Sequence, residues 1–172
     1  MDRELGWISC DNGVALFTED GGKSWQRRLL SYSQEAIFKI FFTDKNHGWA
    51  IIGTKILVTS NGGQSWKPQL NFTERAPIVS IFFLNKSDGW ALGIDNQNGI
   101  GSSSMKDMRG IIFYTNNGGE TWTKSKLPGL EDFYTKIWFS DSMNGWAVSR
   151  DKIYRSENGG RDWLMVLSLP SQ

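Results

Sequence analysis

The chain has 172 residues, of which 39% are hydrophobic, and its 19 basic and 18 acidic residues leave a formal net charge of +1. A chain of this length buries roughly 70% of its unfolded surface, so a compact fold is expected and disorder is not. The near-zero net charge gives no electrostatic basis for binding nucleic acid. Cys10 is the single cysteine, which excludes an intrachain disulfide and a zinc cluster built from cysteines.

Apolar runs in this sequence are too short to cross a membrane as helices, which needs about 18 consecutive apolar residues. The longest runs, such as residues 78–84, have the length of a buried strand. Residues 1–4, Met-Asp-Arg-Glu, do not form the apolar core of a secretory signal. The sequence therefore predicts no direct membrane insertion, and it leaves the cellular compartment open.

An eight-residue pattern, here called the box, occurs four times, at residues 18–25, 59–66, 115–122 and 156–163. It begins with Thr or Ser, continues through Asp or Asn and two glycines to Ser, Thr or Asp, and ends in Trp. Asp or Asn followed by Gly is a strong hairpin signal, because glycine tolerates a positive φ and the Asx side chain accepts hydrogen bonds from nearby amides. We therefore expect each box to be a tight turn between strands, with its Trp buried in a core. The residues that carry these structural roles are Asp20, Trp25, Asn61, Trp66, Asn117, Trp122, Asn158 and Trp163.

A second landmark, Gly-Trp, precedes each box, at residues 6–7, 48–49, 89–90 and 145–146. The box tryptophans are 41, 56 and 41 residues apart, which corresponds to a period of 41 with one insertion of 15 residues. Apolar segments before three of the Gly-Trp pairs, at residues 38–44, 79–85 and 135–141, indicate a first strand, and three more short strands follow in each unit. Four strands in a period near 40 predict an all-β fold, a β-propeller of four-stranded blades.

The predicted units are residues 1–30, 36–71, 77–128 and 133–169 of one propeller domain or part of one. With strands named A to D, the first unit begins at strand B, because only residues 1–5 precede its Gly-Trp pair. We expect four such units to need further blades or a second chain for closure. The insertion, residues 95–110, is expected to be a polar loop between strands B and C of the third unit, at the opposite end of the strands from the boxes.

The box resembles the Asp-box, or BNR, repeat of sialidases, other glycoside hydrolases and sortilin-type receptors. The fuller pattern, in which Asp or Asn precedes Gly-Trp-Ala and a box follows, is similar to the photosystem II stability/assembly factor family and its bacterial relatives at residues 44–66, 85–122 and 141–163. This resemblance implies a seven-bladed, non-catalytic propeller without a cofactor. It also implies an extracytoplasmic or thylakoid-lumen location and binding of reaction-centre protein precursors. The sequence departs from the family in showing four units and no export signal.

The predicted partner is accordingly a protein client, for instance a membrane-protein assembly intermediate. Loops at the end opposite the boxes carry charges of both signs, which suits a protein surface better than a polyanion. An ordinary solvated loop is the alternative interpretation of each of these residues. The predicted partner-binding residues are Arg75, Lys106, Asp107, Arg109, Arg150 and Lys152.

The alternative function is a sialidase-like glycoside hydrolase or a carbohydrate-binding propeller fragment. Sialidases of this repeat class use three arginines, a Tyr nucleophile with a Glu partner and an acidic acid/base. Arg75, Arg109 and Arg150 lie in or near loops at the end opposite the boxes, and Tyr32, Glu35 and Glu74 are also expected near that end. The arginine motif that should precede the first box has no room in residues 1–17. His47 and Cys10 occupy turn and strand positions, so we predict no catalytic residue, no metal ligand and no enzyme activity.

Overall fold

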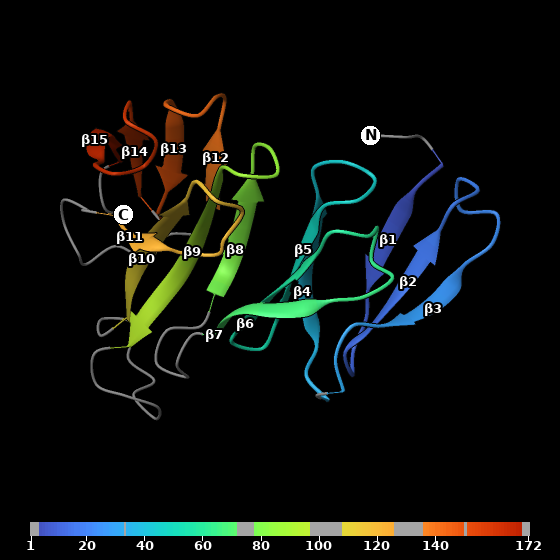
Figure 1. Ribbon diagram of the computed structural model, residues 1–172. Helices are drawn as coiled ribbons and strands as arrows, with labels where there is room; N and C mark the ends of the chain where they lie inside the picture. Colours follow the sequence, from blue (N-terminus) through green and yellow to red (C-terminus); the bar gives the residue numbers. More distant parts are fainter. Residues whose placement is uncertain are drawn as a thin grey trace. The chain divides into compact units, whose positions relative to one another are not determined.

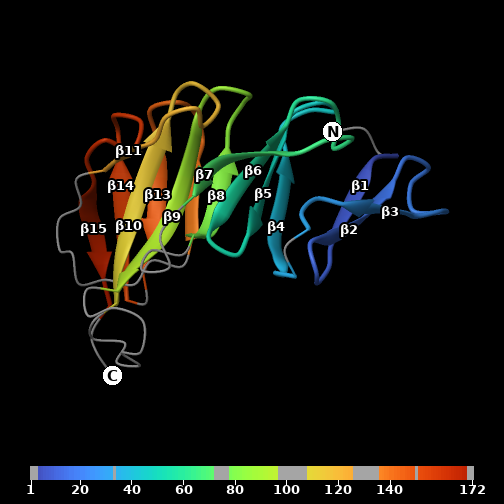
Figure 2. The same cartoon turned by 60° about the horizontal axis from the view of Figure 1, so that its bottom comes forward.

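A computed structural model of the chain describes residues 4–32, 34–71, 78–96, 108–125, 136–149 and 151–169. The chain divides into two compact units, Met1–Asn71 and Phe72–Gln172, and each unit holds two antiparallel sheets. All the regular elements in the described residues are β-strands (Figure 1). Consecutive strands are neighbours in every sheet, as Figure 2 shows. The expected all-β blade architecture is confirmed.

The first sheet has three strands, in the order β1-β2-β3. These are β1 (Gly6–Ser9), β2 (Val14–Thr18) and β3 (Gln26–Leu29). Trp7 of β1 lies opposite Phe17 of β2, and the first box forms the turn from β2 to β3. This sheet therefore begins at strand B in the described residues, as the sequence predicts.

The second sheet is complete, in the order β4-β5-β6-β7. Its strands are β4 (Ile37–Phe42), β5 (Gly48–Ile52), β6 (Lys55–Thr59) and β7 (Lys67–Asn71). Every residue of β5 is buried, as its run of apolar residues requires. Ala50 and Ile52 of β5 join Ala15 of β2 and Ile37 of β4 in the core of this unit.

The third sheet carries the insertion, in the order β11-β10-β9-β8. Its strands are β8 (Ile78–Phe83), β9 (Gly89–Asn96), β10 (Met108–Thr115) and β11 (Thr123–Lys124). The expectation that residues 95–110 form one loop is wrong at both ends, because Asp95 pairs with Arg109 and Asn96 with Met108. This ladder pairing lengthens the hairpin at both strands. Residues 97–107 lie outside the described residues.

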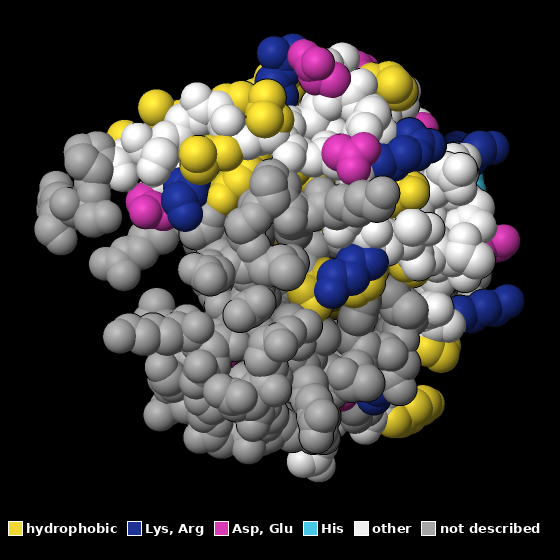
Figure 3. All heavy atoms as spheres, turned by 90° about the vertical axis from the view of Figure 1, so that its left-hand side faces the viewer, with side chains coloured by type: hydrophobic (Ala, Val, Ile, Leu, Met, Phe, Trp, Pro, Cys, Tyr) yellow, Lys and Arg dark blue, Asp and Glu magenta, His cyan; other side chains and the backbone are white. Residues whose placement is uncertain are grey.

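The fourth sheet has the order β12-β13-β14-β15. Its strands are β12 (Lys136–Phe139), β13 (Gly145–Val148), β14 (Lys152–Ser156) and β15 (Leu164–Ser168). Every residue of β15 is exposed, including four apolar ones from Leu164 to Leu167. Figure 3 views the side that carries β15, where hydrophobic and charged side chains share the surface of the described residues.

Candidate functional site

The box turns share one hydrogen-bond network, which fixes what their polar side chains do. In the first box, the hydroxyl of Thr18 donates to Asp20 Oδ1 at 2.8 Å, and the N–H of Gly22 donates back to Thr18 Oγ1 at 2.9 Å. The N–H of Ser24 donates to Asp20 Oδ1 at 2.9 Å and its hydroxyl to Oδ2 at 2.6 Å. Thr18 and Asp20 thus close the turn from both sides, and the bond from the Ser24 N–H to Asp20 is of the kind that the sequence predicts.

In the other three boxes an asparagine amide stands in place of the carboxylate, and the direction of one hydrogen bond is reversed. The side-chain N–H of Asn61 donates to Ser65 Oγ at 2.9 Å, whereas Asp20 accepts at the matching position. In the last box, the same amide group of Asn158 donates to Asp162 Oδ2 at 2.8 Å. The backbone N–H of Asp162 still donates to Asn158 Oδ1 at 3.0 Å, so these bonds match those of the Ser and Thr copies. The amide of Asn158 supplies the donor that Asp162 lacks, so the turn is the same as in the other copies.

Both glycines of each box have positive φ, with values of 66° and 78° at Gly62 and Gly63. In the second, third and fourth boxes, the backbone N–H of the first glycine donates to the connection between the first two strands of the same sheet, and in the first box Gly21 donates to Glu4 O, just before β1, at 2.9 Å. Gly62 donates to Asn46 O at 2.9 Å, and Gly159 donates to Met143 O at 2.9 Å. This bond holds the box turn against the neighbouring turn at the same end of the sheet.

That neighbouring turn has its own Asx side chain. Asp44 Oδ1 accepts from the N–H of Asn46 at 2.8 Å and of His47 at 2.9 Å, and His47 Nδ1 lies 2.9 Å from Asp44 Oδ2. Asn85 and Asp141 make the same pair of backbone bonds in the third and fourth sheets. His47 is therefore a turn residue, as the sequence predicts.

Hydrogen bonding also sets the charge of the box carboxylate. The Ser24 hydroxyl and the Ser24 backbone N–H, followed by the Thr18 hydroxyl, lower the pKa of Asp20 from 3.8 to about 2. The backbone N–H groups of Met143 and Asn144 likewise lower the pKa of Asp141. Hydrogen bonds from the turns stabilise the ionised form of both carboxylates, and neither has the raised pKa of a general acid.

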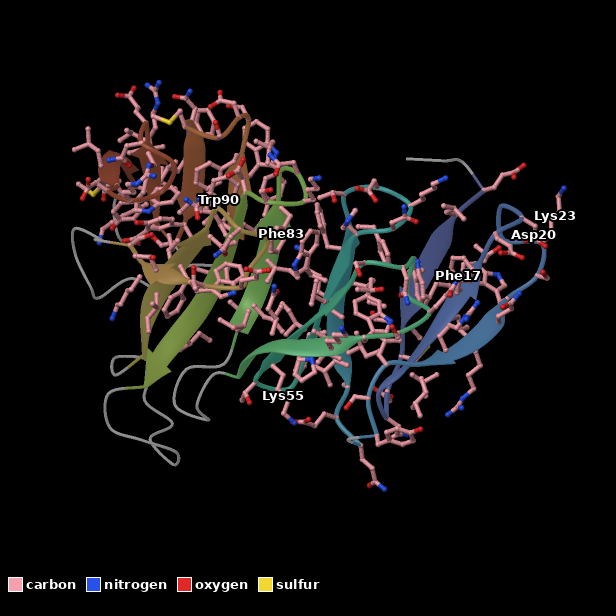
Figure 4. All side chains as sticks on the ribbon, in the orientation of Figure 1. Phe17, Asp20, Lys23, Lys55, Phe83 and Trp90 are labelled. Carbon is pink, nitrogen blue, oxygen red and sulfur yellow. The ribbon has the colours of Figure 1, made fainter. Side chains whose placement is uncertain are left out.

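Stacked aromatic rings join neighbouring sheets within each unit. Trp7 of β1 stacks on Phe42 of β4 at 5.3 Å between centroids, and the box residue Trp66 meets both rings edge-on. In the other unit, Trp90 of β9 stacks on Phe139 of β12, and Trp163 meets Phe139 edge-on at 5.7 Å. Figure 4 shows Trp90 beside β9 and Phe83 on β8. A Gly-Trp tryptophan, a strand-A phenylalanine and a box tryptophan therefore form one repeated cluster.

Burial of the box tryptophans follows from this cluster. Trp163 is 4% exposed, and Trp66 and Trp122 are partly buried. The expectation of a buried ring is wrong for Trp25, which is 40% exposed. The first sheet has no strand A in the described residues, so no strand-A phenylalanine of its own covers Trp25.

Most of the predicted partner-binding residues lie outside the residues that the structure describes. Arg75, Lys106, Asp107 and Arg150 lie outside the described residues, and only the backbone of Arg109 is described, in β10. Lys152 begins β14 and is partly buried; its N–H donates to Ser149 Oγ at 3.2 Å. Whether these side chains form one surface therefore stays a prediction.

The described part of the end opposite the boxes contains two features that the partner-binding prediction missed. Lys55 Nζ lies 3.5 Å from Glu35 Oε2, in a partly exposed ion pair. Tyr32 is 96% exposed in the connection from β3 to β4. Figure 4 places Lys55 at the opposite end of the unit Met1–Asn71 from the box residues Asp20 and Lys23. An aromatic residue in a polar connection was the signal for Tyr32, whereas the ion pair joins two segments that are 20 residues apart in the sequence.

Neither a membrane span nor a metal site is formed by the residues whose structure is described. They contain no helix with the length and apolarity needed to cross a membrane. They also contain no group of three or more His, Cys, Asp or Glu residues arranged to hold a metal ion.

Comparison with known proteins identifies the repeat and the fold. The BNR/Asp-box repeat model matches residues 113–124, which include the third box. The structure "YCF48 bound to D1 peptide" is similar over 99% of this chain, with a TM-score of 0.67 and 24% identity. The chain is a β-propeller segment built on Asp-box repeats. No curated protein sequence matches it.

Two further structures share this fold. YCF48 from Cyanidioschyzon merolae aligns with 98% of the chain at a TM-score of 0.64 and 16% identity. A GH74 enzyme of Niastella koreensis aligns with 97% at a TM-score of 0.74 and 15% identity. The chain spans 52% and 53% of the two YCF48 structures and 28% of the GH74 enzyme. At these identities the likeness establishes the β-propeller fold.

Proposed function

We propose that this chain is a non-catalytic scaffold that binds a protein client at the end of its sheets opposite the boxes. The observation that carries the proposal is the similarity, over 99% of this chain, to a structure of YCF48 with a D1 peptide. The proposed client is therefore an extended peptide segment of another protein. An assembly role like that of the photosystem II factors is the finer form of the same proposal.

The hydrogen bonds of the box turns favour the end of the sheets opposite the boxes as the binding surface. Asp20 and Asn61 are engaged inside their boxes, and Asp44 is engaged in the adjoining turn. Ligand binding there would have to compete with bonds that hold the turns. Connections at the opposite end are free to vary in sequence without disturbing that network.

Side chains at the opposite end have the chemistry of a peptide-binding surface. Tyr32 is almost fully exposed, and tyrosine supplies a large contact area at a small cost in side-chain entropy. In the same unit, Glu35 and Lys55 add charges of both signs. In the other unit, Lys152 adds a positive charge at the end of its own sheet opposite the box. The predicted residues Arg75, Lys106, Asp107, Arg109 and Arg150 belong to the same proposal.

Fluorescence anisotropy with a labelled D1 peptide tests the proposal. We expect the combined variant Tyr32→Ala, Lys152→Glu to bind at least about tenfold more weakly than the wild type, which corresponds to about 1.4 kcal/mol. Lys23→Glu, an exposed charge reversal in the first box, is the matched control and should bind as the wild type does. Equal binding by all three proteins would place the site elsewhere. Absence of binding by the folded wild type would reject a D1-type client.

A glycoside hydrolase is the second candidate, favoured by the similarity to the GH74 enzyme. It is tested with xyloglucan, because one similar GH74 structure is a xyloglucanase of Xanthomonas campestris, and with a fluorogenic sialoside, each with the wild type and with Arg109→Ala. We expect no turnover above the buffer rate from either protein. Turnover that is lost in Arg109→Ala would overturn the non-catalytic proposal.

A further inference from the structure

Three of the four boxes contain Asn followed by Gly, at residues 61–62, 117–118 and 158–159. This dipeptide can deamidate, because glycine has no Cβ to shield its backbone nitrogen from the side chain before it. In that reaction the glycine nitrogen bonds to the Asn Cγ, its proton passes to the side-chain amine, and ammonia leaves. Water then opens the five-membered imide that results and gives either aspartate or isoaspartate. These boxes therefore contain the reactants of a side-chain modification.

The folded turn holds both reacting groups of the last box in place. The N–H of Gly159 donates to Met143 O at 2.9 Å, and a Cβ on Gly159 would lie 2.8 Å from Ser142 O, so this glycine is packed against the neighbouring turn. The side chain of Asn158 makes two bonds to Asp162: its Oδ1 accepts from the backbone N–H at 3.0 Å, and its amide donates to Oδ2 at 2.8 Å. Attack by the glycine nitrogen would break the bonds on both sides, so deamidation requires the turn to open.

Aspartate, one of the two products, fits the second and third boxes. In the first box, Asp20 already occupies this position and accepts from both the N–H and the hydroxyl of Ser24. Asn61 faces the hydroxyl of Ser65, and the third box has a threonine hydroxyl at that position. A hydroxyl accepts from an amide and donates to a carboxylate. Conversion of asparagine to aspartate in either box would therefore give a turn like the first one.

The fourth box does not fit the same product, because Asp162 stands in place of the hydroxyl. An ionised carboxylate has no proton to donate. Asn158→Asp would replace the 2.8 Å bond between these two side chains by two carboxylates in contact, and like charges at this distance repel. Arg161, the cation next to Asp162 in the sequence, is already engaged, since its Nη1 donates to Asn158 O at 2.7 Å and its guanidinium lies 5.4 Å from the ring centre of Tyr114. The last box therefore depends on the amide of Asn158.

Opening of this turn would also affect the third sheet. Gly159 O accepts from the indole N–H of Trp90 at 2.9 Å, and the Trp90 ring stacks on Phe139. A Cβ on Gly160 would lie 2.7 Å from Trp90 Nε1, so the indole packs directly against the glycines of the box. Displacement of residues 158–160 would therefore loosen the packing of the third sheet on the fourth.

We propose that Asn158 is a modification site, whose deamidation to aspartate disables the last box and opens the interface between the third and fourth sheets. Deamidation starts in molecules whose turn has opened, and the product opposes closure of the turn. The reaction therefore permanently marks a chain that has opened at this site. The same conversion at Asn61 or Asn117 gives a folded product. Isoaspartate, the second product, lengthens the main chain and disrupts every box alike, so the aspartate product distinguishes the last box from the others.

Substitutions that reproduce the product test the site in the whole chain. At neutral pH we expect Asn158→Asp to lower the melting temperature by at least about 4 °C, and Asn61→Asp and Asn117→Asp to leave it within about 2 °C of the wild type. Asp162→Ser added to Asn158→Asp gives the carboxylate–hydroxyl pair of the first box and should recover most of the loss. Hydrogen exchange of the Trp90 indole N–H, followed by NMR, should be at least tenfold faster in Asn158→Asp alone.

Chemical ageing tests the modification itself. The wild type and a peptide that copies residues 154–165, Tyr-Arg-Ser-Glu-Asn-Gly-Gly-Arg-Asp-Trp-Leu-Met, are incubated in mildly alkaline buffer, and mass spectrometry of fragments follows deamidation. We expect Asn158 to deamidate at least tenfold more slowly in the folded chain than in the peptide. After ageing in urea and refolding, the folded fraction should retain aspartate at positions 61 and 117 and be depleted of aspartate at position 158.

Three results would overturn the proposal. The first is a melting temperature of Asn158→Asp equal to that of the wild type. The second is a loss that Asp162→Ser does not reduce, because the contact between the two carboxylates would then not be its cause. The third is equal deamidation rates of Asn158 in the folded chain and in the peptide. If Asn158→Asp does not fold but the double variant with Asp162→Ser does, the proposal is supported.

Discussion

Trp90 stacks on Phe139 with ring centroids 3.5 Å apart and planes 10° from parallel. The indole N–H of Trp90 also donates to Gly159 O at 2.9 Å, in the box of the fourth sheet. One side chain therefore contacts both the first strand and the box turn of the next sheet. The box is part of the interface between sheets as well as a turn, which explains why its glycines and its tryptophan recur together.

Removal of a box tryptophan should cost stability in proportion to its burial. Trp66 meets Trp7 and Phe42 edge-on, so we expect Trp66→Ala to lower the free energy of unfolding by about 3–5 kcal/mol. Trp25→Ala is the matched control, and it should cost about 1 kcal/mol for a partly exposed ring with one hydrogen bond to Gly22 O. Urea unfolding of both variants measures the difference. Equal losses would show that exposure does not govern the contribution of these rings.

Added bulk under the strand-A phenylalanine should be destabilising. A Cβ at position 145 would lie 2.5 Å from Phe139 Cζ, so the ring would have to move in a packed core. We expect Gly145→Ala to cost about 1–3 kcal/mol. Gly6→Ala should cost less, since its methyl group would meet Thr18 Cγ2 at 3.0 Å and no phenylalanine ring. Thermal unfolding compares the two, and a stable Gly145→Ala protein would contradict the packing described for the fourth sheet.

Low pH should destabilise the folded chain through the first box, and Asp20→Asn should remove this effect. The pKa of Asp20 is lowered from 3.8 to about 2, so its ionised form stabilises the folded chain above pH 3.8. That contribution is lost as the pH falls from 3.8 towards 2. Asp20→Asn should therefore show a smaller fall in urea midpoint over this range, because an amide does not titrate there.

Asn61→Asp is the converse test. The new carboxylate would accept from the Ser65 hydroxyl, as Asp20 does from Ser24, and the variant should lose more stability in acid than the wild type. Both variants are measured by urea unfolding at about pH 5 and about pH 2.5. An identical acid response in all three proteins would show that the box carboxylate is not coupled to folding.

The insertion should be removable without loss of stability. Asn96 and Met108 are paired neighbours in the β9–β10 ladder, so replacing residues 97–107 by Asn-Gly would connect them through a two-residue hairpin turn. We expect the melting temperature to stay within a few degrees of the wild type, while binding of the D1 peptide weakens. Unchanged binding would exclude the insertion from the client surface. A large drop in melting temperature would show that residues 97–107 support the fold.

The box turns could be predicted in detail because their bonds are local. Thr18, Asp20 and Ser24 lie within one short segment, and all their shared hydrogen bonds are within it. The strands could be predicted because apolar residues recur at one period. Asp162 in place of Ser or Thr keeps the turn because the donor comes from Asn158, so the two positions have to be considered together.

Features that depend on distant segments could not be predicted in the same way. The exposure of Trp25 depends on which strand covers it, although its sequence context matches that of the buried Trp163. The paired ends of the insertion depend on register, which a polar composition does not reveal. The partner-binding residues could be placed only on loops, since a loop sequence does not determine which side chains converge.

The bond from the Trp90 indole to Gly159 also predicts an order of folding. It joins residues 69 apart in the sequence, whereas the bonds that close the turn at residues 156–163 span four residues or fewer. Hairpins of this size form within about 1–10 μs, before contacts between distant segments are made. Each hairpin should therefore be complete before it docks on its neighbour. During synthesis on the ribosome, the interface around Trp90 would therefore stay incomplete until residues 156–163 have emerged.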